Sequence, residues 1–229
     1  MEYKKETFKK ELLNLADEKY RQFSQKLGMG QLEILGIKIP VLKQLAKDLS
    51  KHNWQEFFDA EDNFCAEVVT LKGMCLGYAK LEFDEFSIYL KKFFKMVESW
   101  VETDTTVPTF KIIAKNREKV WQDIQPYLFG NKEYETRLAL IILLDYFLTD
   151  DWIDLVLDVL PKIEQGQYYV DMALAWLLSV CFVKYRDKTL SLIEKKSLSK
   201  FVQNKAIQKA RESFRVSVQD KELLLNFKL

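Results

Sequence analysis

The sequence is poor in the residues that interrupt helices. Its 229 residues include only seven glycines and four prolines. Folds built from short strands need turn residues every few positions, so this scarcity favours helices. The length allows a substantial buried core, either in one large domain or in an array of small repeats.

An excess of one charge is also lacking. Lysine and arginine total 35, aspartate and glutamate total 34, and the formal net charge is +1. A protein that coats nucleic acid has a large basic excess, so we expect any contact with nucleic acid to be local and salt-sensitive. The composition, 48% hydrophobic and 30% charged, is typical of a soluble globular protein.

Few residues are suited to metal binding or nucleophilic catalysis. The sequence has one histidine, His52, and three scattered cysteines, Cys65, Cys75 and Cys181. This pattern predicts reduced, buried thiols of a cytosolic protein. It argues against a zinc site and against a Cys/His catalytic couple, so we expect no metal and no cofactor.

Long hydrophobic runs are missing as well. The longest, "LALIILLDYFL", is interrupted by Asp145 and is shorter than the roughly 18 residues of a membrane span. The first twenty residues alternate charged and apolar positions, unlike a signal peptide. We therefore expect no membrane partner.

The apolar residues recur at helical spacing over most of the chain. Pro40 begins "PVLKQLAKDL", as a proline in the first turn of a helix. Three of the glycines, Gly28, Gly30 and Gly36, precede it and predict a loop or a broken helix. Helices are predicted near residues 5–26, 40–49, 54–60, 63–80, 84–98, 105–115, 117–129, 133–148, 150–160, 167–184, 187–194, 199–214 and 217–227.

Short connections between these helices suggest a repeat. Helix pairs spaced roughly 35–45 residues apart are typical of HEAT-type units, which stack into a curved array with a concave face. Two helices, "TRLALIILLDYFL" and "VDMALAWLLSVCFV", are apolar almost all round and need neighbours on every side. We predict an all-α solenoid of antiparallel helix pairs forming a single domain, residues 1–229. An irregular helical bundle is the alternative.

Four residues recur at about one repeat. Trp100 and Asp104 are four residues apart, on one face if the segment is helical. Arg137 follows Asp104 by 33 residues, and Trp176 follows Arg137 by 39. Residues one repeat apart align along one surface of a solenoid, so all four could converge on the concave face.

Each of the four also has a purely structural interpretation. A lone tryptophan in a helical protein usually packs in the core, and Asp104 before "TTVP" could cap a helix. Arg137 could be the solvated or charge-paired N-terminal residue of an apolar helix. An arginine there is mildly unfavourable to the helix dipole, which favours a functional role.

Four segments make the sequence similar to a known family. They are "LGIKIPVLKQLAKDL", "SWVETDTTVPTF", "YETRLALIILLDY" and "YYVDMALAWLLSVCFVKY" with the downstream "NKAIQKARES". The sequence resembles the AlkD-like family of bacterial DNA alkylation repair proteins, which are HEAT-like-repeat DNA glycosylases. Trp100 and Asp104 match its W-x-x-x-D pattern, Arg137 its later arginine, and Trp176 its last-repeat tryptophan.

The resemblance implies a reaction and a role for each residue. Family members hydrolyse the glycosidic bond of N3- or N7-alkylated purines in double-stranded DNA. Asp104 would stabilise the oxocarbenium character of the sugar and orient water. Trp100 and Trp176 would flank the cationic nucleotide, and Arg137 would hold a backbone phosphate.

Further cations are candidates for phosphate contacts. They are Lys38, Lys43, Lys205, Lys209 and Arg211. Their alternative role is to form a solvated helix face.

One region departs from the family pattern. Active members have a continuous helix before the Gly-Ile pair and a polar, amide-bearing residue after it. This chain has Gly28, Gly30 and Glu33 in that stretch, and Lys38 after the pair. Ser179 stands where some members have an arginine.

Two functions therefore remain open. The first, which the four-residue set favours, is a DNA glycosylase acting on damaged duplex DNA. The second is a HEAT-like binding protein with little or no glycosylase activity, which binds another nucleic-acid structure or a protein. We expect a monomer in the bacterial cytoplasm.

Overall fold

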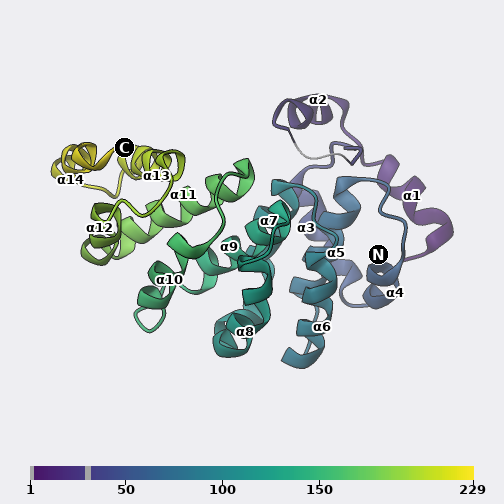
Figure 1. Cartoon of the computed structure of the whole chain (residues 1–229). Helices are drawn as coiled ribbons and strands as arrows, with labels where there is room; N and C mark the ends of the chain where they lie inside the picture. Colours follow the sequence, from purple (N-terminus) through teal and green to yellow (C-terminus); the bar gives the residue numbers. More distant parts are fainter. Residues whose placement is uncertain (1–2, 29–31) are drawn as a thin grey trace. The chain divides into compact units, whose positions relative to one another are not determined.

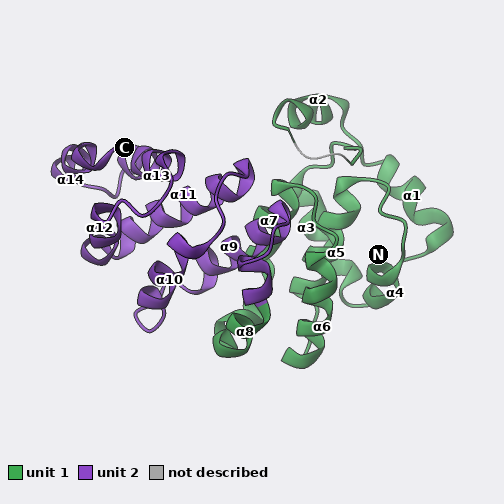
Figure 2. Ribbon diagram, viewed as in Figure 1, with its two compact units in different colours: residues 1–123 green, residues 124–229 purple. Residues whose placement is uncertain are grey.

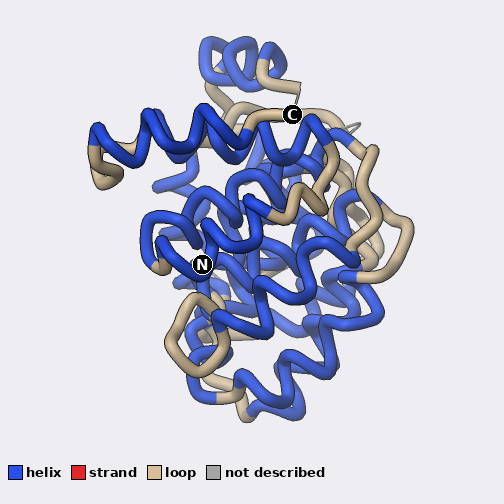
Figure 3. Tube along the Cα trace, turned by 60° about the vertical axis from the view of Figure 1, so that its left-hand side comes forward, coloured by secondary structure: helices blue, strands red, loops and turns tan. Residues whose placement is uncertain are grey.

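A computed structural model describes residues 3–28 and 32–229 of the chain. Every regular element in these residues is helical, and none of them forms a strand (Figures 1 and 3). The chain divides into two compact units, residues 1–123 and residues 124–229, and the boundary falls within helix α8 (Figure 2).

Unit 1 is a stack of short helices. Its α3 packs against α5, and α5 packs against α7, so the first helices of successive pairs lie side by side. Both α4 and α6 also pack on α5. The elements are α1 (Lys5–Leu13), α2 (Glu18–Lys26), α3 (Ile39–Leu49), α4 (Trp54–Asp59), α5 (Ala66–Tyr78), α6 (Phe83–Phe94), α7 (Trp100–Thr106), the 3-10 turns η1 (Val107–Thr109) and η2 (Lys111–Lys115), and the start of α8 (Arg117–Leu128).

Unit 2 repeats the same arrangement. Its α11 packs against α9 and α13, and α10 packs against α12. The elements are α9 (Glu133–Tyr146), α10 (Ile153–Val159), η3 (Leu160–Lys162), α11 (Tyr168–Lys184), α12 (Arg186–Glu194), α13 (Lys200–Glu212), α14 (Val218–Leu223) and η4 (Leu224–Phe227). Stacked helix pairs in both units confirm the predicted all-α, HEAT-like fold class.

The two helices predicted to need neighbours on every side are α9 and α11. In α9 the stretch from Thr136 to Leu143 is buried without interruption. In α11 only a narrow stripe is partly exposed, because α9, α12 and α13 cover the remaining faces. Burial of apolar surface on most sides of these two helices thus stabilises unit 2.

One predicted helix, 105–115, is wrong. The helix begins earlier, at Trp100, and gives way after Thr106 to two 3-10 turns. Pro108 lies in the first of these turns and has no N–H for a helical bond. In the preceding turn, Thr105 and Thr106 donate their hydroxyls to the carbonyls of residues 101 and 102, which loosens the helix.

The glycine-containing segment is a loop where it is described. The helix α2 ends at Lys26, and residues 32–38 have no regular structure, whereas Gly30 lies outside the described residues. Gly36 has φ +84°, and a Cβ there would lie 2.4 Å from the carbonyl oxygen of Asp17. The loop therefore requires glycine at this position.

A buried carboxylate holds the same loop. Glu67, in the first turn of α5, accepts hydrogen bonds from the N–H groups of Leu35 (3.0 Å), Gly36 (2.7 Å) and Ile37 (3.2 Å). These bonds satisfy three successive backbone donors that no helix or strand would pair. The loop leading to Lys38 is consequently fixed.

The expected thiol state agrees with the structure. Cys65, Cys75 and Cys181 are free and buried. Burial raises the pKa of the Cys65 and Cys181 thiols to about 12, so neither is a ready nucleophile. In the part of the chain that the structure describes, no helix combines the length and apolarity needed to cross a bilayer.

Candidate functional site

The short helix α7 begins with a capping box. The Ser99 hydroxyl accepts a bond from the N–H of Glu102 at 3.4 Å. In return, Oε2 of Glu102 accepts from the N–H groups of Ser99 (3.0 Å) and Glu98 (2.6 Å). A helix of seven residues is marginal alone, so these bonds and its packing on α5 fix its position.

Trp100 and Asp104 form the accessible face of this helix. They are one turn apart on α7, and both side chains are partly exposed. The hydroxyl of Thr103 donates to Oδ1 of Asp104 at 2.8 Å, which restrains the carboxylate. Four other residues of the helix are buried: Val101, Glu102, Thr103 and Thr106. An indole and a carboxylate are therefore presented together at the surface of unit 1.

Asp104 does not cap a helix, which corrects the structural interpretation of this residue. The cap is Ser99, five residues earlier, and Asp104 lies inside α7. The structural interpretation of Trp100 as a core residue also fails, because the side chain is only half-buried.

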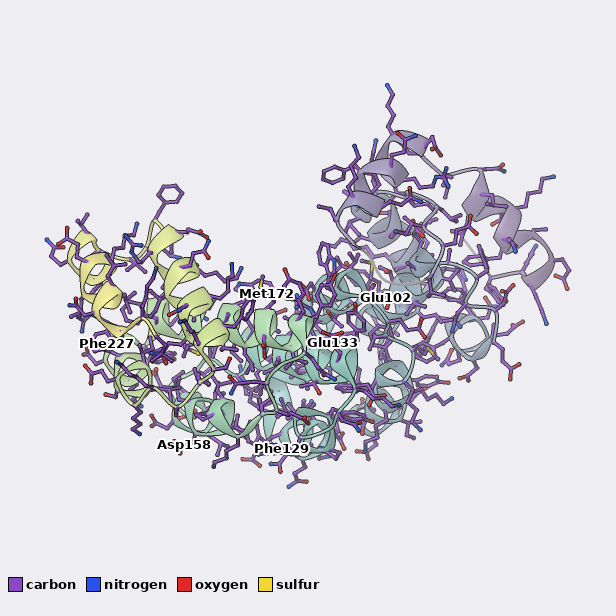
Figure 4. The ribbon with its side chains drawn as sticks, turned by 45° about the horizontal axis from the view of Figure 1, so that its top comes forward. Glu102, Phe129, Glu133, Asp158, Met172 and Phe227 are labelled. Carbon is purple, nitrogen blue, oxygen red and sulfur yellow. The ribbon has the colours of Figure 1, made fainter. Side chains whose placement is uncertain are left out.

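Glu102 is a feature that we did not single out in the sequence. Its side chain, labelled in Figure 4, is fully buried, and Oε1 has no hydrogen-bond partner among the described residues. Burial raises the pKa of this carboxyl to about 7, against the lowering effect of the two backbone bonds. The spacing S-x-x-E in "SWVE" is a capping-box pattern and could have revealed it.

Close packing holds α7 against α5. A Cβ on Gly73 of α5 would lie 2.4 Å from the ring of Phe93 and 2.7 Å from Cγ2 of Thr106. Only glycine lets the two helices approach this closely. The helix that carries the candidate site is thus packed so closely at Gly73 that no larger side chain fits there.

Arg137 is a buried residue of unit 2. Its side chain lies in the first half of α9, 6% exposed. Nη1 donates to the carbonyl oxygen of Tyr169 at 2.8 Å, and the guanidinium carbon lies 5.9 Å from the centre of the Tyr169 ring. The interpretation of Arg137 as a solvated helix terminus is therefore wrong.

Glu133, one turn before Arg137 on α9, completes a clamp on α11. Its Oε1 accepts the N–H of Tyr169 at 2.7 Å. The two α9 side chains thus hold the N–H and the carbonyl of the same residue, in the first turn of α11. The sequence could not show this clamp, because its partner lies more than thirty residues further along the chain.

Trp176 lies on the one accessible stripe of α11. The stripe is partly exposed and follows helical spacing; its residues are Tyr169, Met172, Trp176, Val180 and Val183 (Figure 4 labels Met172). Trp176 and the C-terminal part of the stripe line a surface cavity of about 290 Å³, together with Lys209, Glu212 and Arg215. Ser179, buried beside it, donates its hydroxyl to the Trp176 carbonyl at 2.7 Å.

The other predicted phosphate contacts have varied surroundings. Lys38 forms an ion pair with Asp17 at 3.0 Å, and Lys43 is exposed on α3. On α13, Lys205 bonds to Gln208, Lys209 borders the Trp176 cavity, and Nε of Arg211 donates to the carbonyl of Lys221 at 3.0 Å. Their contact with DNA stays a prediction.

The four-residue set is divided between the units. Trp100 and Asp104 belong to unit 1, whereas Arg137 and Trp176 belong to unit 2. The structure brings the first two together on α7. Convergence of all four on one surface stays a prediction. Among the described residues, no group of three or more His, Cys, Asp and Glu side chains could hold a metal ion.

Fold and site together define a helical-repeat protein with accessible aromatic side chains in both units and a carboxylate beside one of them. The family follows from comparison with known proteins: residues 8–212 match the family described as DNA alkylation repair enzyme. The chain belongs to this family, which supports a role in DNA alkylation repair and implies a DNA-binding repair protein. No curated protein matches the chain.

Proposed function

We propose that the protein is a DNA glycosylase that releases cationic N3- or N7-alkylated purines from duplex DNA. The observation that carries the proposal is the pairing of Trp100 and Asp104 on the accessible face of a largely buried helix. Family membership supplies the substrate class, DNA with alkylation damage. The proposal treats residues 1–229 as one functional domain that acts as a cytoplasmic monomer.

The chemistry needs little more than a fixed negative charge. An alkylated purine is already cationic, so the C1′–N bond breaks with its electron pair passing to the base, which leaves neutral. Positive charge then develops on the deoxyribose, where the Asp104 carboxylate would stabilise it. Water adds to C1′, and its proton passes through Asp104 to solvent.

The aromatic residues and Arg137 would bind rather than react. An indole face attracts a cation, so Trp100 and Trp176 would favour the charged lesion over normal bases. Arg137 would hold a backbone phosphate through its planar, forked donors. The bond from Nη1 to the Tyr169 carbonyl fixes the plane of that fork.

The second function, binding without excision, is favoured by the segment before α3. The described residues 32–38 are not helical, and Lys38 is engaged by Asp17 rather than left to a phosphate. The family resemblance implies a continuous helix here that contacts the DNA at the lesion, and the described residues 32–38 do not form one. A protein of this kind would bind a different nucleic-acid structure or a protein.

Measuring base release decides between the two. Duplex DNA that contains 7-methylguanine or 3-methyladenine is incubated with the protein, and the free base is quantified by chromatography. We expect wild type to release base and Asp104→Asn to be slower by about 100-fold or more. The matched control is Asp158→Asn, an exposed carboxylate on α10 (Figure 4), which should act like wild type. Equal rates for wild type and Asp104→Asn would contradict the glycosylase.

A further inference from the structure

Four aromatic rings form a continuous row in unit 2. The ring centres of Tyr134 and Tyr169 are 5.3 Å apart, those of Tyr169 and Tyr168 are 5.1 Å apart, and those of Tyr168 and Phe201 are 6.2 Å apart. The rings come from the first turns of α9, α11 and α13, which are the first helices of three successive pairs. The row therefore runs across the repeats, not along one helix.

Hydrogen bonds between the helices hold the row in place. On one side, Glu133 and Arg137 fix the backbone of Tyr169 at 2.7 Å and 2.8 Å. On the other, Oε1 of Gln165 accepts the N–H of Ser199 at 2.7 Å, and Ser199 caps α13 just before Phe201. The start of α11 is thus tied to α9, and the start of α13 is tied to the segment before α11, so little ordering remains to be done on binding.

The row is not explained by packing of the core. Tyr168 is 58% exposed and Phe201 is 42% exposed, whereas Tyr134 and Tyr169, which continue the row, are partly buried. Single exposed apolar residues are ordinary on a protein surface, but two adjacent exposed rings that continue into partly buried rings form a platform.

The charges around the row nearly balance. Lys132 is paired with Glu135 at 2.9 Å. The same helix starts and the segment before α11 also carry the exposed Lys200 and the acidic Glu133 and Glu164. A surface for phosphate groups would need an excess of cations. Flat, uncharged faces are the better match for these rings.

The row also continues toward Trp176. Tyr169 lies seven residues before Trp176 on α11, which is about 10 Å along the helix axis, with Met172 between them on the same accessible stripe. A nucleotide strand that reaches Trp176 along this stripe would pass directly over the row.

We propose that Tyr134, Tyr169, Tyr168 and Phe201 form a stacking platform for unpaired nucleobases of DNA. Every base has a π-face that can stack on an aromatic side chain whatever its sequence, so the platform would hold a locally opened strand without reading it. This inference rests on the proposed DNA-repair function, because that function makes a nucleic-acid strand the occupant. A proline-rich peptide, which also binds aromatic-lined grooves, is the competing occupant for the test.

The test uses the two exposed rings. Fluorescence anisotropy measures the affinity of the full chain for a labelled 16-nucleotide single strand and for a blunt duplex of the same length. We expect Tyr168→Ala/Phe201→Ala to bind the single strand about tenfold more weakly or worse, and the duplex with much less change. The conservative pair Tyr168→Phe/Phe201→Tyr should keep wild-type affinity. Phe129→Ala, which removes another ring that is 50% exposed in unit 2, is the matched control.

Two results would overturn the platform. One is unchanged single-strand affinity in the double alanine variant when its circular dichroism and melting temperature match wild type. The other is wild-type binding of a proline-rich peptide but not of the single strand. Base release measured on the same variants separates this proposal from the glycosylase. If wild type binds the single strand through the two rings but releases no base, the platform is supported and the glycosylase is contradicted. If wild type releases base but the double alanine variant binds the single strand as well as wild type does, the glycosylase is supported and the platform is contradicted.

Discussion

The accessible faces of α7 and α11 differ in chemistry and in support. The face of α7 pairs an indole with a carboxylate, whereas the stripe of α11 is aromatic and apolar throughout. A fixed carboxylate can stabilise a developing positive charge, and an aromatic stripe can only bind and orient. Under the proposed function, the reaction would take place at α7 in unit 1, and α11 in unit 2 would recognise the nucleotide.

The two helices are also held in different ways. The seventeen residues of α11 are buried among apolar neighbours on most sides. The seven residues of α7 depend on a capping box and on the close approach at Gly73. Polar groups should therefore contribute more to the stability of α7 than to that of α11. The first prediction tests such a group on α7, and the next tests the recognition expected of α11.

The largest effect is expected at Glu102, through pH. The pKa of this carboxyl is raised from 4.5 to about 7 by burial, so the folded protein binds the proton more tightly than the unfolded chain. The contribution of Glu102 to the free energy of unfolding is fully present below about pH 4.5 and is lost as the pH rises through 7. The loss amounts to roughly 3 kcal/mol. Glu102→Gln cannot ionise and should lose this dependence.

Urea unfolding of wild type and Glu102→Gln at several pH values measures this effect. The two proteins should have similar free energies of unfolding near pH 4.5, and the variant should become the more stable one by pH 8. Glu61→Gln, an exposed carboxylate in the same unit, should follow the wild-type curve. Parallel curves for wild type and Glu102→Gln would show that the buried carboxyl does not govern α7.

A smaller effect is expected at Trp176, on the recognition side of the comparison. Trp176→Ala should weaken binding of duplex DNA with 7-methylguanine by about twofold to 30-fold, the range of a cation–π contact. Affinity for the undamaged duplex should change less, because a neutral base gains little from the indole quadrupole. Anisotropy titrations of both duplexes provide the comparison.

The conservative control is Trp152→Phe, in the N-cap of α10 and away from the stripe. It should leave both affinities at the wild-type level. An equal loss for damaged and undamaged DNA in Trp176→Ala would show that Trp176 does not recognise the positive charge of the lesion.

The contrast between α7 and α11 also decides what the sequence could predict. α9 and α11 were found almost to their ends, because apolar residues all round a helix leave one structural solution. The start of α7 was missed, since its threonines and Pro108 resemble a junction and only the Ser99–Glu102 pair marks the cap. Local hydrogen bonds, rather than hydrophobic periodicity, determine that helix.

For the candidate site, spacing within a helix was predictable and contact between helices was not. Trp100 and Asp104 are four residues apart, so their shared face follows from the helix itself. The Glu133–Arg137 clamp and the Glu67 contacts join residues thirty or more positions apart, which no local pattern encodes. The aromatic row could be predicted from the sequence, because the spacings from Tyr134 to Tyr168 and from Tyr168 to Phe201 are 34 and 33 residues, close to one repeat.

The smallest effect is expected where the loop before α3 meets α2. Asp17 both caps α2, by accepting the Tyr20 N–H at 3.0 Å, and pairs with Lys38 at 3.0 Å. Asp17→Asn keeps a capping oxygen but removes the charge, so it should release Lys38 and tighten duplex binding about twofold to threefold at low salt, with the gain fading at high salt. Anisotropy against salt measures this, and Asp17→Asn/Lys38→Gln should cancel the gain. If Asp17→Asn binds no better than wild type at any salt, Lys38 does not contact DNA, and the phosphate contacts must come from the other candidate cations.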